Sequence, residues 1–297
     1  MKIILSLLLI ILLSSCATAE EKQKLALKDG DRKLLEYNAA YIPSPVKEKP
    51  YYGRSGFIHP VYTPEGKIVT DPFPKDHLHQ HALMFAWTSS IIDGKKVDFW
   101  NSHRKAGRIE HVETITESAD KIVVKLRHVN ISKGKDEVVL EETWEITRIP
   151  HKGLNIFDLK STQNVVNRES LKIQKYHYGA MCIRGAGAWL KDMNVTTSEG
   201  KDRKAANHSR PNWVAMSGEV DGDMCGIAAM SHPANFRAPQ PVRVHPEKPY
   251  FCFAPMVLGD FEISKGKPYV SRFRFVAFDG SAQSHALNEV YKDFSKK

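Results

Sequence analysis

A series of short apolar segments, divided by turns, is the feature that most constrains the fold of this chain. Residues 121–129 are rich in β-branched side chains, and residues 138–149 follow after a turn at Gly134. This pattern predicts a β-hairpin with Trp144 and Ile146 on its inward face. Further strands are expected at residues 155–166, 172–184, 213–220, 226–231, 250–258 and 269–278.

Many strands without alternating helices predict an all-β protein, in which antiparallel sheets pack as one large sandwich. A C-terminal helix is also expected, with Ser281 as its N-cap. Its apolar stripe would consist of Ala282, Ala286, Leu287, Val290, Tyr291 and Phe294. Since all-β domains can exceed about 200 residues, residues 51–297 are expected to form a single domain.

The N-terminus has the pattern of a secreted lipoprotein. Lys2 precedes an apolar run at residues 3–13, and Leu13-Ser14-Ser15-Cys16 resembles a bacterial lipobox. Residues 1–15 are therefore expected to be a signal peptide, with Cys16 lipidated as the new N-terminus. Residues 16–50 are polar and are expected to be a tether and extended entry. The mature protein should lie in the cell envelope, on the periplasmic or outer-membrane side, attached to the membrane by lipid only.

Charge and cysteine content narrow the classes of partner. The formal charge of +9 falls by one, to +8, when Lys2 is removed with the signal peptide. The basic residues are dispersed, so nucleic acid is not expected as a partner, whereas an anionic saccharide or a membrane surface fits better. The sequence has no CxxC pair, and no cofactor is expected. Cys182, Cys225 and Cys252 lie in apolar segments and should be small core residues, with one disulfide left open.

Three histidines lie close together in the segment from Asp76 to Trp87. In an extended strand His77, His79 and His81 would point to one face. Asp76 could fix the tautomer of one ring by accepting its N–H. A polar loop without function is the alternative.

Two further segments carry polar groups beside expected strands. His177 lies in Tyr176-His177-Tyr178-Gly179, and the other segment is Ser231-His232-Pro233-Ala234-Asn235-Phe236-Arg237. Loops at strand ends often bind ligands, and a locally bonded turn is the alternative interpretation of the second segment. Trp87 and Trp100 are interpreted as core more readily than as a binding platform. The other histidines are interpreted as surface or locally bonded residues: His59, His103, His111, His128, His151, His208, His245 and His285.

A family resemblance joins these motifs. Asp76-His77-x-His79 leads into Phe85-Ala86-Trp87, and the other matching positions are Gly94, Val97-Asp98-Phe99-Trp100, Gly107-Arg108-Ile109, Tyr178-Gly179, Arg184, Trp213, Ser217-Gly218, Gly226-Ile227-Ala228 and His232-Pro233-x-Asn235-x-Arg237. This order resembles the PmoA-like family ("methane oxygenase PmoA") over roughly residues 50–280. Where that family usually has Asp-His-Pro-His-His-Arg, this chain has Leu78, Gln80 and His81. The resemblance implies an extracytoplasmic protein of polysaccharide-degrading bacteria, on a galactose-mutarotase-like supersandwich. It does not imply methane oxidation, which would need several spanning helices.

The leading hypothesis is a carbohydrate-active enzyme. His79, His81, His177 and His232 would be catalytic, because imidazoles exchange protons near neutral pH. Substrate binding would fall to His77, Trp100, Asn235 and Arg237. No paired carboxylates are recognised, which favours lyase, epimerase or mutarotase chemistry over hydrolysis.

Two alternatives remain open. One is a non-catalytic saccharide-binding lipoprotein. The other is a cupin-like metal oxygenase, although Ala82 and Leu83 occupy the positions where its glutamate ligand would lie, so no metal ligand is assigned. A geometric prediction follows from the leading hypothesis. At least two of the four catalytic candidates should line one pocket, with Arg237 at its wall and Trp87 or Trp100 beside it.

Overall fold

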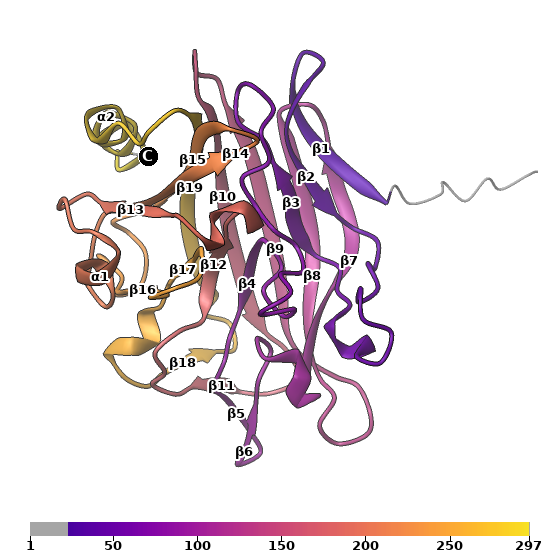
Figure 1. Ribbon diagram of the computed structural model, residues 1–297. Coiled ribbons are helices and arrows are strands. Elements are labelled where there is room, and N and C mark those ends of the chain that lie inside the picture. Colours follow the sequence, from indigo (N-terminus) through magenta and orange to yellow (C-terminus); the bar gives the residue numbers. More distant parts are fainter. Residues whose placement is uncertain (1–22, 297) are drawn as a thin grey trace, which may run out of the picture.

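The computed structural model describes residues 23–296, which form three antiparallel sheets (Figure 1). The first is a seven-stranded sheet with the spatial order β1-β2-β3-β4-β12-β17-β16. Its strands are β1 (Lys24–Asp29), β2 (Arg32–Asn38), β3 (Phe57–Val61), β4 (Leu83–Ala86), β12 (Ala180–Arg184), β16 (Val242–Val244) and β17 (Tyr250–Phe253).

The second is an eight-stranded sheet with the order β13-β14-β15-β19-β10-β9-β8-β7. Its strands are β7 (Gly107–Glu117), β8 (Lys121–Asn130), β9 (Glu137–Ile149), β10 (Asn155–Val165), β13 (Asn194–Thr197), β14 (Trp213–Val220), β15 (Asp223–Ser231) and β19 (Tyr269–Asp279).

A smaller four-stranded sheet has the order β18-β11-β5-β6. Its strands are β5 (Ser90–Ile92), β6 (Lys95–Val97), β11 (Ser170–Ile173) and β18 (Phe261–Ser264). The helical elements are α1 (Arg203–Ala206), α2 (Ser284–Phe294) and the 3-10 turns η1 (Pro50–Tyr52), η2 (Ser102–Arg104), η3 (Gly187–Leu190) and η4 (Pro255–Leu258). Within residues 23–296, no helix combines the length and the apolar character needed to cross a membrane.

The two large sheets pack face to face and enclose the main core, which confirms the all-β sandwich. Tyr37 of β2 meets Trp144 of β9 edge-on, with ring centroids 6.1 Å apart, and both rings are fully buried. Burial of one such side chain contributes about 1.5–3 kcal/mol. The predicted hairpin is confirmed, because β8 pairs with β9 and both Trp144 and Ile146 face this core.

The inward face of this hairpin also carries a buried polar pair. His128 Nε2 lies 2.7 Å from Glu142 Oε2, and both side chains are fully buried. Glu142 Oε1 also accepts hydrogen bonds from Trp144 and Ser161, each at 2.6 Å. His128 is therefore a core residue, and its interpretation as a surface or locally bonded residue is wrong.

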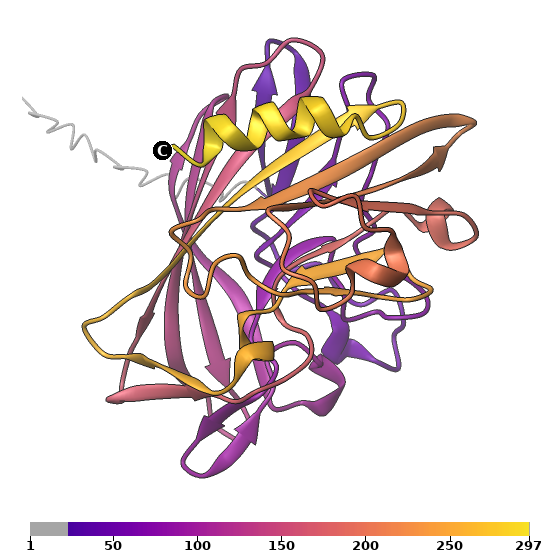
Figure 2. The same cartoon turned by 90° about the vertical axis from the view of Figure 1, so that its left-hand side faces the viewer.

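The C-terminal helix α2 covers the outer face of the eight-stranded sheet, as Figure 2 shows. Leu287, Val290 and Phe294 are buried there in a second apolar cluster. The predicted helix is confirmed, but Ser281 is not its cap: the helix begins at Ser284 after Gln283, whose side chain makes no capping hydrogen bond. All three predicted core cysteines are buried and unpaired, so the disulfide left open is not formed.

Residues 24–38 belong to the sandwich, although the sequence predicts a tether as far as residue 50. β1 and β2 form a hairpin at one edge of the seven-stranded sheet. Its leucines are buried, and the charged residues around them make the segment polar on average: Leu25, Leu27, Leu34 and Leu35 are at most 3% exposed. The predicted signal peptide and the lipidated Cys16 lie outside the described residues.

Candidate functional site

A concave pocket of about 380 Å³ lies on the outer face of the seven-stranded sheet. Tyr250 of β17 and Arg184 of β12 are register partners. Side chains of a strand alternate between its two faces, so Phe253, three positions after Tyr250, points the opposite way. Phe253 packs on Phe273 of the other large sheet, with ring centroids 5.5 Å apart. Tyr250 and Arg184 therefore face away from the core between the two large sheets. We call this site the histidine pocket. Its lining residues are His77, His79, Gln80, Trp100, Asn101, His103, Arg104, His177, Tyr178, Arg243, His245 and Tyr250.

The segment that carries His77 and His79 is a pair of turns. The N–H of His77 donates to the carbonyl of Pro74 at 3.0 Å, and the N–H of Gln80 donates to the carbonyl of His77 at 2.8 Å. The expected extended strand with three histidines on one face is therefore wrong. β4 begins only at Leu83, and the turns send His77 and His79, but not His81, to the pocket.

Asp76, His77 and Arg184 form a connected group at this pocket. Asp76 Oδ2 lies 3.0 Å from His77 Nδ1. Arg184 donates from Nη2 to Asp76 Oδ1 at 2.7 Å and from Nη1 to Asp76 Oδ2 at 3.2 Å. Arg184 Nη1 also donates to Gln80 Oε1 at 2.9 Å, so the guanidinium fixes both ends of the turn.

The electrostatics of this group keep Asp76 ionised. Burial raises the pKa of Asp76, but hydrogen bonds from His77 and Arg184 outweigh burial and leave the pKa below its usual value. An ionised carboxylate accepts the Nδ1–H of His77. Neutral His77 then has an unprotonated Nε2, which is the arrangement of a general base.

Two pocket histidines, His79 and His245, are neutral at pH 7. Burial, followed by the charges of His77 and His103, lowers the pKa of His79 to about 3. Burial, followed by Arg243 and His77, lowers the pKa of His245 to about 4. His245 Nδ1 accepts the backbone N–H groups of Glu247 and Lys248, each at 3.1 Å, so its proton is on Nε2. His245 is thus a hydrogen-bond donor toward the pocket.

Tyr178 and Asn101 form the opposite wall. Asn101 Nδ2 donates to the Tyr178 oxygen at 3.0 Å and to Asp98 Oδ2 at 2.8 Å. With Asn101 as the donor, this contact does not use the phenolic hydrogen of Tyr178. Asp98 Oδ1 accepts the backbone N–H of Trp100 at 3.0 Å, which holds the turn into η2. Burial raises the pKa of Tyr178, so the phenol stays protonated and can donate a hydrogen bond to a ligand.

His177 reaches the pocket because the predicted strand 172–184 is interrupted. β11 ends at Ile173 and β12 begins at Ala180, so the intervening loop leaves the sheet. Gly179 has φ +133°, and a Cβ there would lie 3.0 Å from Met256 Cε, so this bend requires glycine. His177 is exposed on this loop. Partial burial of the ring, followed by the charges of Arg243 and His208, lowers the pKa of His177.

His81, a predicted catalytic residue, lies in the core. It is 2% exposed, and its ring packs against Phe57 and Phe73 with centroids 5.6 and 4.9 Å away. His81 Nδ1 contacts the carbonyl oxygen of Pro72 at 3.2 Å. Burial holds the pKa of His81 well below its usual value. Its ring is therefore placed as a structural group and does not line the histidine pocket.

The loop from His232 to Arg237 does not join the histidine pocket either. His232 lines a separate pocket of about 200 Å³, and its Nδ1 accepts the N–H of Ala234 at 3.0 Å. Asn235 Nδ2 donates to the carbonyl of Arg272 at 2.8 Å, and its Oδ1 accepts the N–H of Arg272 at 2.8 Å. The loop's polar groups thus stabilise a turn, which was the alternative interpretation.

Arg237 also forms its hydrogen bonds with backbone groups. Its guanidinium donates to the carbonyl groups of Pro255, Gly259 and Asp260 at 2.9, 2.7 and 2.9 Å. The geometric prediction therefore holds for His79 and His177, which share a pocket, but it is wrong for Arg237, which is not among the lining residues.

The two tryptophans have different surroundings. Trp87 is fully buried and donates from Nε1 to Gln163 Oε1 at 2.7 Å, so it is a core residue. Trp100 lines the pocket but is only 1% exposed. It lies beneath Tyr178 and Tyr250, with ring centroids 5.5 and 5.9 Å away. Trp100 therefore supports the pocket floor and does not present a free face to a ligand.

Several pocket residues were not predicted: His103, Arg104, Tyr178, Arg243 and His245. They come from η2, from the loop before β12, and from β16 and its following turn. Tyr178 is adjacent to a predicted residue, His177, and is the one with a local signal. His103 and Arg104 follow the predicted residue Trp100 in η2, whereas Arg243 and His245 are brought to the site by the order of the strands.

The pocket histidines do not converge as metal ligands do. Among residues 23–296, no three His, Cys, Asp or Glu side chains converge on a point that could hold an ion. The ring centroids of His77 and His79 are 5.6 Å apart, and His81 turns away into the core. The ligand set considered for a metal oxygenase is not assembled by these residues.

Comparison with known proteins corrects the family resemblance. The model of a "Family of unknown function (DUF6807)" matches residues 24–292. Nothing found supports membership of a PmoA-like or methane oxygenase family, so that assignment is wrong. No curated protein matches this chain.

Two solved structures are similar in shape. A galactose mutarotase-like protein from Lactobacillus casei ATCC 334 has a TM-score of 0.46 and 8% identity, covering 86% of this chain and 99% of that one. A galactose mutarotase related enzyme from Lactobacillus acidophilus has a TM-score of 0.38 and 10% identity, covering 87% and 97%. At these values neither similarity assigns a substrate or a reaction to this chain.

Proposed function

We propose that the histidine pocket of this chain, which belongs to the DUF6807 family of unknown function, binds a saccharide. We further propose that His77 accepts a proton from that saccharide. The observation that carries the proposal is the Asp76–His77 pair, held by the fully buried Arg184 at the pocket. A carboxylate that fixes an imidazole tautomer is what a histidine base requires.

The surroundings of His77 suit a sugar. Saccharides present many hydroxyl groups, and the pocket offers neutral imidazoles, the amides of Gln80 and Asn101, and the phenol of Tyr178. A few placed polar groups beside aromatic side chains are typical of small-molecule sites, and a volume of about 380 Å³ falls in their usual range.

The lining argues for a particular class of chemistry. None of the residues that line the histidine pocket is Asp or Glu, whereas ordinary glycoside hydrolysis uses two carboxyl groups. A histidine base and a protonated tyrosine fit proton removal from a sugar carbon or hydroxyl, as in lyase, epimerase or mutarotase reactions. Tyr178, with its raised pKa, would donate a hydrogen bond to the oxygen that gains negative charge.

The test is to incubate the purified protein with panels of mono- and oligosaccharides and to follow products by mass spectrometry and NMR. Variant His77→Ala should lose turnover while it still binds the saccharide, because the pocket volume remains. His151→Ala, a surface histidine in the β9–β10 turn, should behave like the wild type. Folded protein that transforms no sugar in the panel would contradict the enzymatic proposal.

A non-catalytic saccharide-binding protein is the second candidate. It is favoured by the same lining, because hydrogen-bonding groups without a carboxylate suffice for binding. Binding without turnover in the wild type, unchanged in His77→Ala, would select this candidate.

We also propose that the protein is attached to the cell envelope by a lipid on Cys16. The support is the sequence Leu13-Ser14-Ser15-Cys16 after an apolar run. Metabolic labelling with a fatty acid should mark the wild type but not Cys16→Ser. Equal labelling of both would contradict it.

A further inference from the structure

A second, basic pocket adjoins the histidine pocket. It has a volume of about 490 Å³ and is lined by Arg203, Lys204, Asn207, Arg243, Val244 and Pro246. Arg243 lines both pockets, so they share a wall. Figure 1 shows α1, which carries Arg203 and Lys204, beside β16, which carries Arg243.

The position of Arg243 is fixed by its neighbours. Its Nη1 donates to Asn207 Oδ1 at 3.0 Å and to the carbonyl of Val244 at 3.2 Å. Asn207 Oδ1 also accepts the N–H of Val244 at 3.2 Å, which ties the end of α1 to β16. Within residues 23–296, Nε and Nη2 of Arg243 have no acceptor. The guanidinium is therefore held in place with donors to spare.

The charge of the basic pocket is uncompensated. Over the described part of the chain, Arg203, Lys204 and Arg243 form no ion pair, whereas the nearby Lys201 pairs with Glu199 at 2.9 Å. Neither pocket has Asp or Glu in its lining. Three cations without counter-charges around one concavity attract an anion, and the planar arginine fork matches a carboxylate or a sulfate.

We infer that the two pockets together bind an anionic oligosaccharide: one sugar occupies the histidine pocket, and the carboxylate or sulfate of a neighbouring sugar pairs with Arg203, Lys204 and Arg243. This inference rests on the proposed function, since it assigns the ligand class to the same site. Arg243, at the shared wall, would contact both sugars.

The test uses the purified full-length protein and isothermal titration calorimetry. The probes are galacturonic acid and its di-, tri- and tetrasaccharides, neutral oligosaccharides of the same lengths, and a sulfated galactan tetrasaccharide. We expect an anionic tetrasaccharide to bind at least about tenfold more tightly than its monosaccharide. The affinity for the tetrasaccharide should fall at high salt. The uronate and sulfate arms identify which anionic group is recognised.

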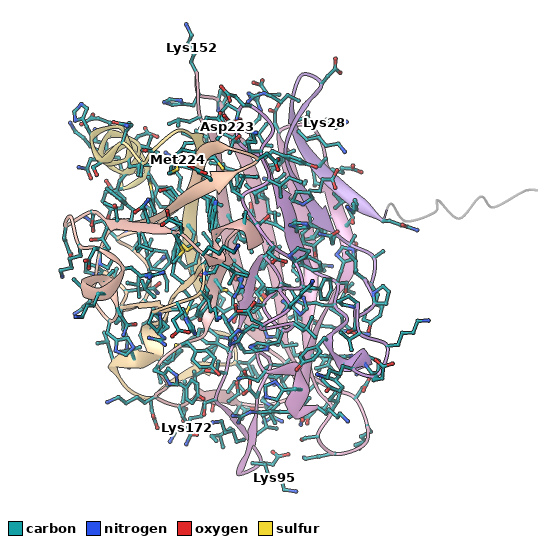
Figure 3. The ribbon with its side chains drawn as sticks, in the orientation of Figure 1. Lys28, Lys95, Lys152, Lys172, Asp223 and Met224 are labelled. Atoms are coloured by element: carbon teal, nitrogen blue, oxygen red, sulfur yellow. The ribbon has the colours of Figure 1, made fainter. Side chains whose placement is uncertain are left out.

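The double variant Arg203→Ala/Lys204→Ala should remove this gain with length and leave monosaccharide binding unchanged. Lys204→Glu, a single surface change, should also weaken binding of the anionic tetrasaccharide. The matched control is Lys28→Ala/Lys152→Ala, which removes the same charge at the top of the view in Figure 3, away from α1 and β16. This control should bind like the wild type.

Two failures are distinguishable. If anionic oligosaccharides bind no more tightly than neutral ones of equal length, or if the double variant binds them unchanged, this inference is wrong, while binding or turnover of neutral sugars still supports the proposed function. If no saccharide of either kind binds, both are wrong.

Discussion

Arg184 on β12 donates hydrogen bonds to both carboxylate oxygens of Asp76, at 2.7 and 3.2 Å, although its side chain is fully buried. This contact joins residues 108 positions apart and holds the turn that carries His77 and His79. A buried guanidinium is stable only with such partners. The ion pair of Arg184 and Asp76 thus stabilises the fold and also positions the pocket histidines.

The first prediction concerns this pair. Arg184→Met should abolish saccharide turnover and lower the free energy of unfolding by about 3 kcal/mol, because the partly buried Asp76 carboxylate loses its charge partner. Arg184→Lys should recover part of the stability but little activity, since lysine lacks the planar fork. Urea unfolding and turnover assays measure the two effects. Wild-type activity in Arg184→Met would show that Asp76 needs no such support.

The second prediction is a pH dependence of stability. An unfolded histidine has a pKa of about 6.5, whereas the pKa of folded His79 is about 3. Between these values the unfolded chain binds a proton that the folded protein does not, so the free energy of unfolding falls as pH falls. His245, with its pKa at about 4, acts in the same direction.

Urea unfolding between about pH 5 and pH 7 checks this, because most carboxyl groups remain ionised there. His79→Gln should have a shallower slope of stability against pH than the wild type, by at most about 1.4 kcal/mol per pH unit. His151→Gln, which removes an exposed histidine, is the control. Equal slopes in His79→Gln and the wild type would indicate that folding does not lower the pKa of His79.

The third prediction separates His81 from the pocket histidines. His81→Leu should lower the free energy of unfolding by about 1–2 kcal/mol, because the contact with the Pro72 carbonyl is lost. Saccharide binding and turnover below the melting temperature should not change. Loss of turnover at unchanged stability would restore the catalytic role for which the sequence had suggested His81.

The fourth prediction concerns the core pair of His128 and Glu142. His128→Ala should lower the free energy of unfolding by about 1.5–3 kcal/mol, because it leaves the fully buried Glu142 carboxylate without one of its hydrogen-bond partners. His128→Ala combined with Glu142→Gln should be less destabilised than the sum of the two single variants. A denaturant-based double-mutant cycle measures this coupling. Additive effects would mean that the two side chains do not interact.

Several strands were predictable because apolar and β-branched runs bounded by turns mark them. Residues 213–220 were predicted and observed as β14, and Trp144 and Ile146 face the core as expected. β1 and β2 were missed because charged residues surround their short leucine runs and make the segment polar on average. Gly179 interrupts the strand predicted over residues 172–184, and only the tertiary contact with Met256 shows that a glycine is needed there.

The site was only half predictable, for a related reason. The local sequence indicated His77, His79 and His177 as site residues, and these three line the pocket. The same local pattern also indicated His81, which is buried in the core. His245 and Arg243 lie far along the chain and reach the pocket only because β16 and β17 follow β12 in the sheet. The motif from His232 to Arg237 resembled a binding loop because side chains that stabilise a turn are of the same types as those that bind sugars.

The measurement that tests the central claim most directly is deuterium exchange into a bound saccharide. The wild type, incubated in D₂O with each saccharide that it binds, should introduce deuterium at one carbon or accelerate mutarotation, and NMR locates the position. Asp76→Asn, which removes the carboxylate that fixes His77, should slow this at least about 100-fold while saccharide binding persists. A rate of exchange or mutarotation in Asp76→Asn equal to that of the wild type would contradict the assignment of His77 as the base. So would the absence of both carbon-bound deuterium and accelerated mutarotation in every saccharide that the wild type binds.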